Sequence, residues 1–386
     1  MKYNLLRCKW MLAGFAAAFL IGDMFLAVRG AATTSVEFLY GVAGFSLAQL
    51  FWTIGQLREA RPDARVFLAA AFPLAAFVLC RLHPPVLPAA ATAAVCAYSV
   101  LTALSFATAF ATRRVFYICG IGLLLFSDLM IGGGLVRMPG CNALIGPTYI
   151  AAEACLLASF FWSGEWRVAP ERIGVRWYAL TLGTAGFACF FVAMTLYPGG
   201  GYNPLMQMLS ALGETKVRGV RYPSCHYWFV VGMFLSAASV AGVWAHLVRR
   251  IGGGWRRALV GWGGAVNVVG LCTIALVPFD ANGTVHNVGC YLATFGGAAI
   301  LVAQFRKGAD LAWTVWFVVL VIVFALCLDL KAIPFSPYVT TTQKLLIASF
   351  AVWAGWLAWR RKSPLGILPI VGRGGIVHFN GRDLSQ

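Results

Sequence analysis

Charged residues are scarce in this chain of 386 residues. They make up 11% of it, and only 13 residues are acidic, whereas roughly a quarter of the residues in soluble domains are charged. Apolar residues make up 60%, which is more apolar surface than a soluble fold of this size can bury. The composition therefore excludes an ordinary soluble domain and indicates a membrane protein.

The chain also lacks the features of several other protein classes. Its eleven Cys include no C-x-x-C pair, although Cys141 and Cys225 fall in predicted external loops and could form a disulfide. The formal net charge of +17 comes without a basic stripe interleaved with aromatic residues, so it does not indicate nucleic-acid binding. We attribute this charge to the excess of Lys and Arg in the cytoplasmic loops of membrane proteins.

Runs of about 20 apolar residues recur along the whole chain, which is typical of membrane-spanning helices. Backbone polar groups in lipid must pair within their own segment, so these runs predict helices. The sequence thus predicts an all-α, polytopic protein of about twelve transmembrane helices, arranged as two six-helix halves. The predicted spans are 10–29, 36–57, 66–82, 88–111, 115–136, 142–163, 177–197, 226–248, 258–278, 287–305, 312–329 and 341–360.

The distribution of Lys and Arg predicts that both termini lie in the cytoplasm. With that orientation, 22 of the 30 basic residues fall in cytoplasmic segments, which leaves eight outside, as the positive-inside rule requires. Those eight are Arg29, Arg81, Arg137, Lys216, Arg218, Arg221, Lys331 and Lys344.

Carboxyl groups inside predicted spans are costly in lipid and therefore mark candidate sites. At about 1.5 Å of rise per residue, Asp23 and Asp128 both lie roughly 20 Å above the inner ends of their helices, in the outer half of the membrane. Gln49, Tyr98 and Glu153 lie nearer its middle. Two carboxyl groups at one level can divide the work of general acid and base. In the alternative interpretation, the two Asp side chains cap helix breaks or pair with nearby hydroxyl groups.

The second half offers a different set of polar residues at its predicted external end. Ser210, His226, Asp280 and His286 should all lie on that side of the membrane, where they could form a hydrolytic or a metal site. Their spacing matches no specific zinc motif, and no metal is assigned. The alternative is that these side chains cap helices and contact lipid headgroups.

Five segments in the first half, over roughly residues 10–163, resemble the YhhN-type lysoplasmalogenase family. They are IGDMFLAVRG, FLYGVAGFSLAQLFWTIGQL, AYSVLTALSFATAF, GIGLLLFSDLMIGG and PTYIAAEACLLASFF. The resemblance implies hydrolysis of the vinyl-ether bond of lysoplasmalogens to an aldehyde and a glycerophospho-alcohol. It also implies that Asp23 and Asp128 are catalytic, with Tyr98 and Tyr149 beside them. The chain departs from the family pattern with Gln49 for His and Glu153 for Gln.

The second half, over about residues 178–360, resembles a bacterial domain of unknown function, number 998, which is similar to FRAG/DRAM/Sfk-type six-helix membrane proteins. The segments are YNPLMQMLSALGE, HYWFVVGMFL, LVPFDANGTVHNVGCYLATFGG and TTQKLLIASFAVWAGWLAW. The resemblance implies lipid handling and points to Ser210, His286, Gln343 and Lys344.

Together these observations predict a YhhN-like domain over residues 1–166, a FRAG/DRAM-like domain over 177–362 and a cytoplasmic tail over 363–386. The predicted function is vinyl-ether lysophospholipid hydrolysis by intramembrane carboxyl groups, with a membrane lipid as the substrate, no cofactor and no nucleic-acid partner. The expected location is a bacterial cytoplasmic membrane. The alternatives are a non-catalytic membrane scaffold or sensor and a lipid transporter of six plus six helices.

Overall fold

The structure is a computed structural model, and it describes residues 5–28, 32–57, 60–83, 86–136, 141–161, 175–251, 253–304, 309–329 and 337–359. Within these residues the chain forms twelve α-helices, as the apolar runs predict. Their bounds are α1 (Leu5–Asp23), α2 (Val36–Leu57), α3 (Ala64–Phe77), α4 (Ala89–Thr112), α5 (Val115–Leu135), α6 (Cys141–Phe161), α7 (Val175–Thr195), α8 (Ser224–Arg250), α9 (Trp255–Leu276), α10 (Gly283–Gln304), α11 (Ala309–Asp329) and α12 (Pro337–Trp359).

The helices have the length and composition of membrane spans. Among the described residues, eight helices are long and apolar enough to cross a membrane, and three shorter apolar helices accompany them. The chain is therefore a polytopic helical membrane protein. A crossing by all twelve helices and the cytoplasmic position of both termini remain predictions. The predicted tail and most of the predicted domain boundary lie outside the described residues.

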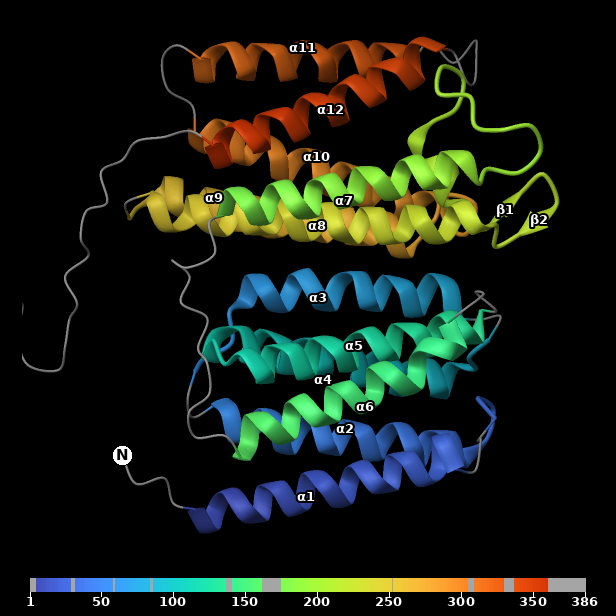
Figure 1. Cartoon of the computed structure of the whole chain (residues 1–386), viewed down its shortest axis with the longest axis vertical. Coiled ribbons are helices and arrows are strands. Elements are labelled where there is room, and N and C mark those ends of the chain that lie inside the picture. The colour runs from blue at the N-terminus through green and yellow to red at the C-terminus, as the bar shows by residue number, and fades with distance from the viewer. Residues whose placement is uncertain are drawn as a thin grey trace, which may run out of the picture.

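The helices run side by side in one elongated stack, with α1 at one end and α11 at the other (Figure 1). The two halves of the chain meet where α3 packs against α9. One apolar cluster spans this seam, since it joins Phe77 and Leu82 of the first half to Leu276 and Val277 of the second. The halves therefore share a core.

Polar groups also bridge the seam between the two halves, where α3 and α9 end. Arg81 is 6% exposed, and its Nη1 donates to the carbonyl oxygen of Leu276, the last residue of α9, at 3.4 Å. A cation at that position also interacts favourably with the helix dipole. A second contact between the halves joins α6 and α8, where Cys141 Sγ lies 3.3 Å from the Tyr227 hydroxyl oxygen. Cys141 and Cys225 are both free thiols, so the disulfide considered for them does not form.

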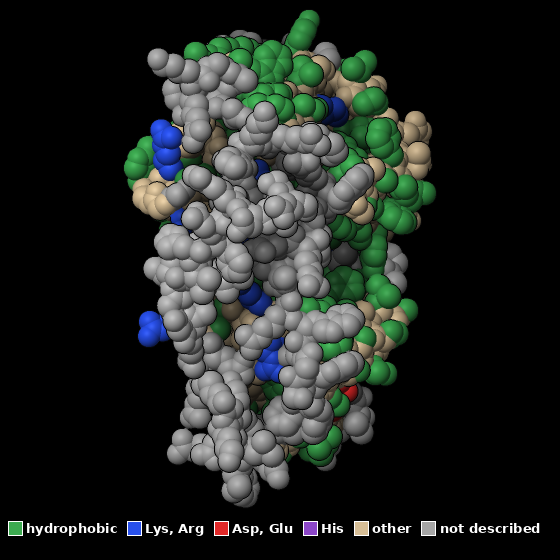
Figure 2. All heavy atoms as spheres, turned by 60° about the vertical axis from the view of Figure 1, so that its left-hand side comes forward, with side chains coloured by type: hydrophobic (Ala, Val, Ile, Leu, Met, Phe, Trp, Pro, Cys, Tyr) green, Lys and Arg blue, Asp and Glu red, His purple; other side chains and the backbone are tan. Residues whose placement is uncertain are grey.

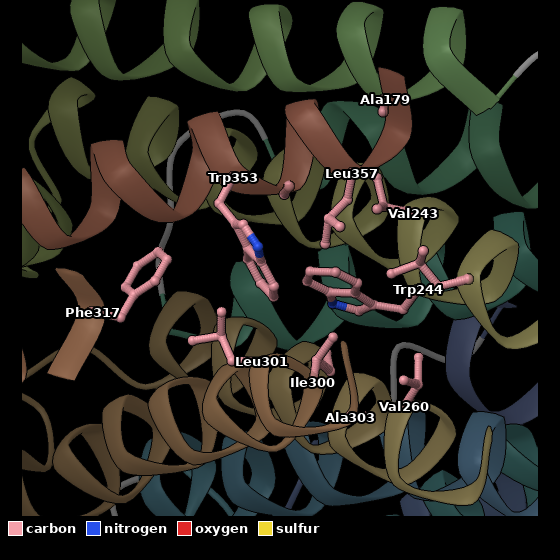
Figure 3. Packing of buried hydrophobic residues seen from close by; sticks show 12 residues of the cluster. Ala179, Val243, Trp244, Val260, Ile300, Leu301, Ala303, Phe317, Trp353 and Leu357 are labelled. Carbon is pink, nitrogen blue, oxygen red and sulfur yellow. The ribbon is translucent and has the colours of Figure 1, made fainter. Parts of the chain in front are cut away.

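The core of the second half is built around aromatic residues. Trp244 and Trp353 face one another above Ile300 and Leu301 (Figure 3), with ring centroids 5.7 Å apart. The Trp244 Nε1–H donates to Asn267 Oδ1 at 3.1 Å, and Asn267 Nδ2 donates to the Ala293 carbonyl oxygen at 2.7 Å. Buried polar groups in this core thus find partners, as they must where no water can reach them.

Basic and apolar side chains occupy different parts of the surface, as expected of a membrane protein. Figure 2 brings forward the side of the stack on which α1 starts, and it shows Lys and Arg side chains on that side with hydrophobic side chains covering the flank. Exposed apolar residues on α11 include Val315, Val318 and Ile322. A flank of this kind suits contact with lipid tails rather than water.

The segment between α7 and α8 departs from the all-α expectation. It contains a 3-10 turn, η3 (Leu209–Gly213), and a hairpin of two short strands, β1 (Lys216–Val217) and β2 (Val220–Arg221). The strands are antiparallel, with Lys216 opposite Arg221 and Val217 opposite Val220. The hairpin lies on the side of the stack opposite the start of α1 (Figure 1).

Candidate active site

Two Tyr–Asp pairs lie in the first half, and each joins two different helices. The Tyr98 hydroxyl of α4 donates to Asp128 Oδ2 of α5 at 2.7 Å. Two further polar side chains lie near Tyr98. Thr102 Oγ1, one turn along α4, donates to the Tyr98 carbonyl oxygen at 3.1 Å, and Gln49 of α2 lies beside the hydroxyl itself. Three helices therefore place polar groups around Asp128.

The second pair joins the first and last helices of this half. The Tyr149 hydroxyl of α6 donates to Asp23 Oδ1, at the end of α1, at 2.7 Å. Asp23 directly precedes a single π-helical turn, η1 (Met24–Val28); such turns are frequent at functional sites. Glu153, one turn beyond Tyr149, is close enough to Asp23 for their charges to interact.

Small and aromatic residues fix the position of Asp23. A Cβ on Gly44 of α2 would lie 2.7 Å from the backbone nitrogen of Gly22, so α1 and α2 can cross this closely only because Gly44 has no side chain. The Phe19 ring of α1 stacks on the Tyr149 ring, with 5.4 Å between their centroids, and meets the Phe45 ring edge-on at 5.1 Å. The carboxyl group of Asp23 is thereby held next to the Tyr149 hydroxyl.

An apolar cavity reaches both tyrosines. Its volume is about 120 Å³, and it is open in part to the surface. Tyr98, Asp128 and Tyr149 line it together with aliphatic and aromatic side chains of α2, α3, α4 and α5. Several lining residues, such as Leu82 and Leu87, belong to the cluster at the seam. A molecule in this cavity would meet one polar region in otherwise apolar walls.

Two buried polar side chains of α2 have atoms without a partner among the described residues. Gln49 is 3% exposed and Trp52 is 6% exposed, and neither Gln49 Oε1 nor Trp52 Nε1 has a hydrogen-bond partner among the described residues. They lie three residues apart, so both fall on one face of α2. The sequence marked Gln49 for the pocket, and Gln49 is not among the residues that line the cavity. The sequence did not mark Thr102, which does line it, because a hydroxyl in an apolar run resembles ordinary packing.

The candidate residues of the second half gather at one end of it, but each bonds to the backbone. His226 Nδ1 donates to the Gly213 carbonyl oxygen at 2.6 Å, and His286 Nδ1 donates to that of Val277 at 2.9 Å. Asp280 accepts from the backbone nitrogens of Thr215 and Lys216 and from the Thr215 hydroxyl. Within the described residues, no hydrogen bond joins any two of the side chains of Ser210, His226, Asp280 and His286.

Gln343 and Lys344 of α12 likewise hold the segment that precedes α8. Gln343 Oε1 accepts from the Leu209 backbone nitrogen at 3.0 Å. Lys344 Nζ donates to the carbonyl oxygens of Pro204 and Gln207 at 2.5 and 2.6 Å. Bonds of this kind anchor a loop. In the part of the chain that the structure describes, no group of three or more His, Cys, Asp or Glu side chains could hold a metal ion.

Comparison with known proteins bears on the first half alone. The model of the YhhN family matches residues 3–160, which contain both Tyr–Asp pairs and the cavity. Residues 3–160 belong to the YhhN family. The chain matches no curated protein and no solved structure, and no family model identifies the second half.

The YhhN assignment agrees with the resemblance stated for this half, whose segments cover nearly the same residues. It assigns residues 3–160 of this membrane protein to the YhhN family. The resemblance of the second half to the domain of unknown function 998 and to FRAG/DRAM/Sfk-type proteins remains a prediction. The catalytic roles of Asp23 and Asp128 are likewise predictions, to which the geometry of the YhhN segment gives a physical basis.

Proposed function

We propose that the YhhN segment hydrolyses the vinyl-ether bond of a lysophospholipid, with Asp23 and Asp128 as its acid and base. The observation that carries the proposal is the Tyr98–Asp128 pair at an otherwise apolar cavity, with the Tyr149–Asp23 pair reaching the same cavity through Tyr149. An apolar cavity suits a hydrocarbon chain. The adjoining carboxyl groups suit general acid–base chemistry.

The reaction needs one proton donor and one water. A carboxylic acid transfers its proton to the terminal carbon of the C=C–O unit, which leaves an oxocarbenium ion on the carbon bonded to oxygen. Water then adds to that carbon while a carboxylate accepts its proton, giving a hemiacetal. The hemiacetal then loses its bond to the glycerol oxygen, which takes up a proton while the hydroxyl group gives one up. The products are an aldehyde and a glycerophospho-alcohol, so one vinyl ether and one water are consumed. The proposal requires one Asp to be protonated while the other is ionised.

The tyrosines act as positioning residues in this scheme. Each hydroxyl donates to one carboxyl oxygen, so the other oxygen of that group stays available for proton transfer. Tyr98 and Tyr149 come from α4 and α6, and they hold Asp128 and Asp23 on α5 and α1. The tyrosines therefore tie each of the two helices that carry a reacting carboxyl group, α5 and α1, to a neighbouring helix.

The experiment is aldehyde release from a lysoplasmalogen by the purified full-length protein, compared with Asp23→Asn and Asp128→Asn variants. Removing a general acid or base lowers a rate by about 10²–10⁴-fold, and we expect that loss for both variants. Asp63→Asn is the matched control: Asp63 lies outside the spans at the start of α3, and Asn also serves as an N-cap.

An ester-linked lysophospholipid of equal chain length should yield no aldehyde. Full activity in both membrane-embedded variants would remove the carboxyl groups from the mechanism. A complete absence of aldehyde release from the native protein, in detergent and in liposomes, would leave the non-catalytic scaffold or sensor as the function of this fold.

We further propose that the chain consists of two six-helix domains, with the second one handling lipid beside the first. The shared apolar cluster at the seam supports this, because it includes walls of the cavity such as Phe77 and Leu82 together with Leu276 of the second half. The second half therefore backs one wall of the cavity that the first half forms.

A further inference from the structure

The β1–β2 hairpin carries three basic residues in six positions. Lys216 and Arg221 lie directly opposite one another across the strands, and Arg218 occupies the turn. All three are exposed. Like charges directly opposite in a β-ladder are destabilising, so this pairing reduces the stability of the hairpin.

The backbone of the hairpin is strained as well. Arg218 has φ 46° and Tyr222, just after β2, has φ 49°. Positive φ is uncommon for residues with a Cβ and costs free energy, above all for bulky ones. In the described part of the chain, the remaining such residue is Arg113, which caps α4. Unfavourable charge and unfavourable backbone conformation thus coincide in one short segment.

Within the described residues, no acidic side chain forms an ion pair with any of these three cations. The ion pair that forms there is Arg65–Asp63, at the start of α3. Asp280 lies at the base of the hairpin, where it accepts from the backbone and hydroxyl of Thr215 and from the Lys216 backbone nitrogen. Glu214 is half-buried beside it, and burial together with Asp280 raises the pKa of Glu214 to about 7, which reduces the negative charge it brings.

The ring of Tyr222 contacts two guanidinium groups at the base of the hairpin. The Arg221 guanidinium lies over its ring at 5.6 Å and the buried Arg81 guanidinium at 5.8 Å, both within the range of a cation–π contact. The hairpin base is therefore fixed by Asp280 on one side and by Tyr222 on the other. An exposed cationic hairpin held in this way is preorganised for an anionic partner.

The surroundings of the hairpin fit a membrane surface. Val220 on β2 is 46% exposed, Phe279 next to Asp280 is 51% exposed, and Trp228 one turn into α8 is 41% exposed. Exposed Trp and other apolar side chains beside the ends of membrane helices are typical of the headgroup region. The hairpin stands at that level, on the side of the stack opposite the start of α1 (Figure 1).

We propose that the hairpin is a docking surface for anionic phospholipids, whose phosphate groups bind Lys216, Arg218 and Arg221. Phosphate oxygens accept hydrogen bonds from guanidinium and ammonium groups, and each basic residue at a membrane surface contributes to attraction of anionic lipid. The occupant also relieves the repulsion between Lys216 and Arg221. The positive-inside rule depletes such residues from the predicted external side, so their concentration here calls for a ligand.

The test uses the full-length protein in nanodiscs that contain phosphatidylglycerol with a photoreactive group near its phosphate. After illumination, cross-linked peptides are mapped, and a phosphatidylcholine probe of the same design is run in parallel. We expect labelling of the hairpin by the phosphatidylglycerol probe, and at least about tenfold less of it in a Lys216→Gln, Arg218→Gln, Arg221→Gln variant.

Labelling around the exposed Arg256 and Arg257 at the start of α9 serves as the internal control, since it should be equal in both proteins. A charge-preserving variant, Lys216→Arg, Arg218→Lys, Arg221→Lys, should keep the labelling and show that the strand pairing survives. The thermal unfolding midpoint of the Gln variant should equal or exceed that of the native protein, because it loses the like-charge pair.

Equal labelling of the hairpin by the two probes would overturn the proposal, as would undiminished labelling in the Gln variant. Competition by inorganic phosphate at millimolar concentration, with no preference between the two lipids, would show a free-phosphate site instead and would also overturn it. None of these outcomes depends on aldehyde release by the YhhN segment.

Discussion

The Tyr98–Asp128 hydrogen bond allows the candidate site to be tested without assuming its chemistry. Tyr98→Phe removes one oxygen atom from a contact of 2.7 Å and leaves the ring in place. A hydrogen bond to a neutral group contributes about 0.5–1.5 kcal/mol to stability, and one to a charged group about 1.5–3 kcal/mol. The size of the effect therefore also indicates whether Asp128 is neutral or ionised.

A double-mutant cycle with Asp128→Asn isolates this contact from other consequences of each change. We expect a coupling free energy of about 1–3 kcal/mol, since the pair lies among apolar helices where water does not replace the lost partner. The assay is unfolding of the purified protein in detergent, followed by the reactivity of its free thiols. Aldehyde release by the same four proteins gives the functional counterpart.

A coupling below about 0.5 kcal/mol, the lower end for residues in contact, would refute the reasoning. It would mean that the two side chains do not interact in the folded protein. A large coupling with unchanged aldehyde release by Tyr98→Phe would instead assign the bond to stability alone. The equivalent cycle of Tyr149 and Asp23, whose contact is also 2.7 Å, provides the comparison.

Three further predictions follow from other parts of the structure. Gly270→Ala should destabilise the protein by about 1–3 kcal/mol, because its Cβ would collide with the Ala293 backbone of α10; Gly355→Ala, in open space on α12, should be neutral or stabilising by up to about 1 kcal/mol. Both are measured by thermal unfolding, and equal effects would contradict the close packing of α9 and α10. Burial, together with Asp280, raises the pKa of Glu214 to about 7. The protonated side chain therefore contributes to the free energy of unfolding at pH 4, and this contribution is lost as the pH rises through 7. The unfolding midpoint should therefore fall between pH 5 and pH 8, and Glu214→Gln should flatten this fall; an unchanged slope would exclude Glu214 as its source. Asp63→Ala should cost about 0.5–2 kcal/mol, because it removes an N-cap and the partner of Arg65, and a variant as stable as Asp63→Asn would show that the cap contributes nothing.

Every α-helix of this protein that the structure describes was predicted from the sequence, with ends that agree to within about six residues. The span expected at 88–111 forms the helix Ala89–Thr112, and the span expected at 36–57 forms Val36–Leu57. This success has a physical reason, since lipid forces every long apolar run to satisfy its own backbone as a helix. The hairpin within residues 198–225 was not predicted, because in water a backbone has alternatives to a helix.

The side-chain partners could be predicted only in part. Asp23 and Asp128 stood out because carboxyl groups are costly in apolar spans. Their bonds to Tyr149 and Tyr98 depend on which helix faces meet, and helices that are apolar all round carry no pattern that specifies those faces. Arg81 was missed for a related reason: it was placed in an external segment with other cations, whereas its partner lies 195 residues away.

That separation has a consequence for how the protein is made. Arg81 enters the membrane early in synthesis, and its acceptor, the Leu276 carbonyl oxygen, exists only once six more helices have followed α3. Until then the guanidinium has to remain hydrated or be held by the insertion machinery, because an unpaired cation is costly in lipid. The first half therefore depends on the second for the partner of Arg81. A nascent chain stopped before α9 would expose an unpaired guanidinium group to the cell's quality-control proteases.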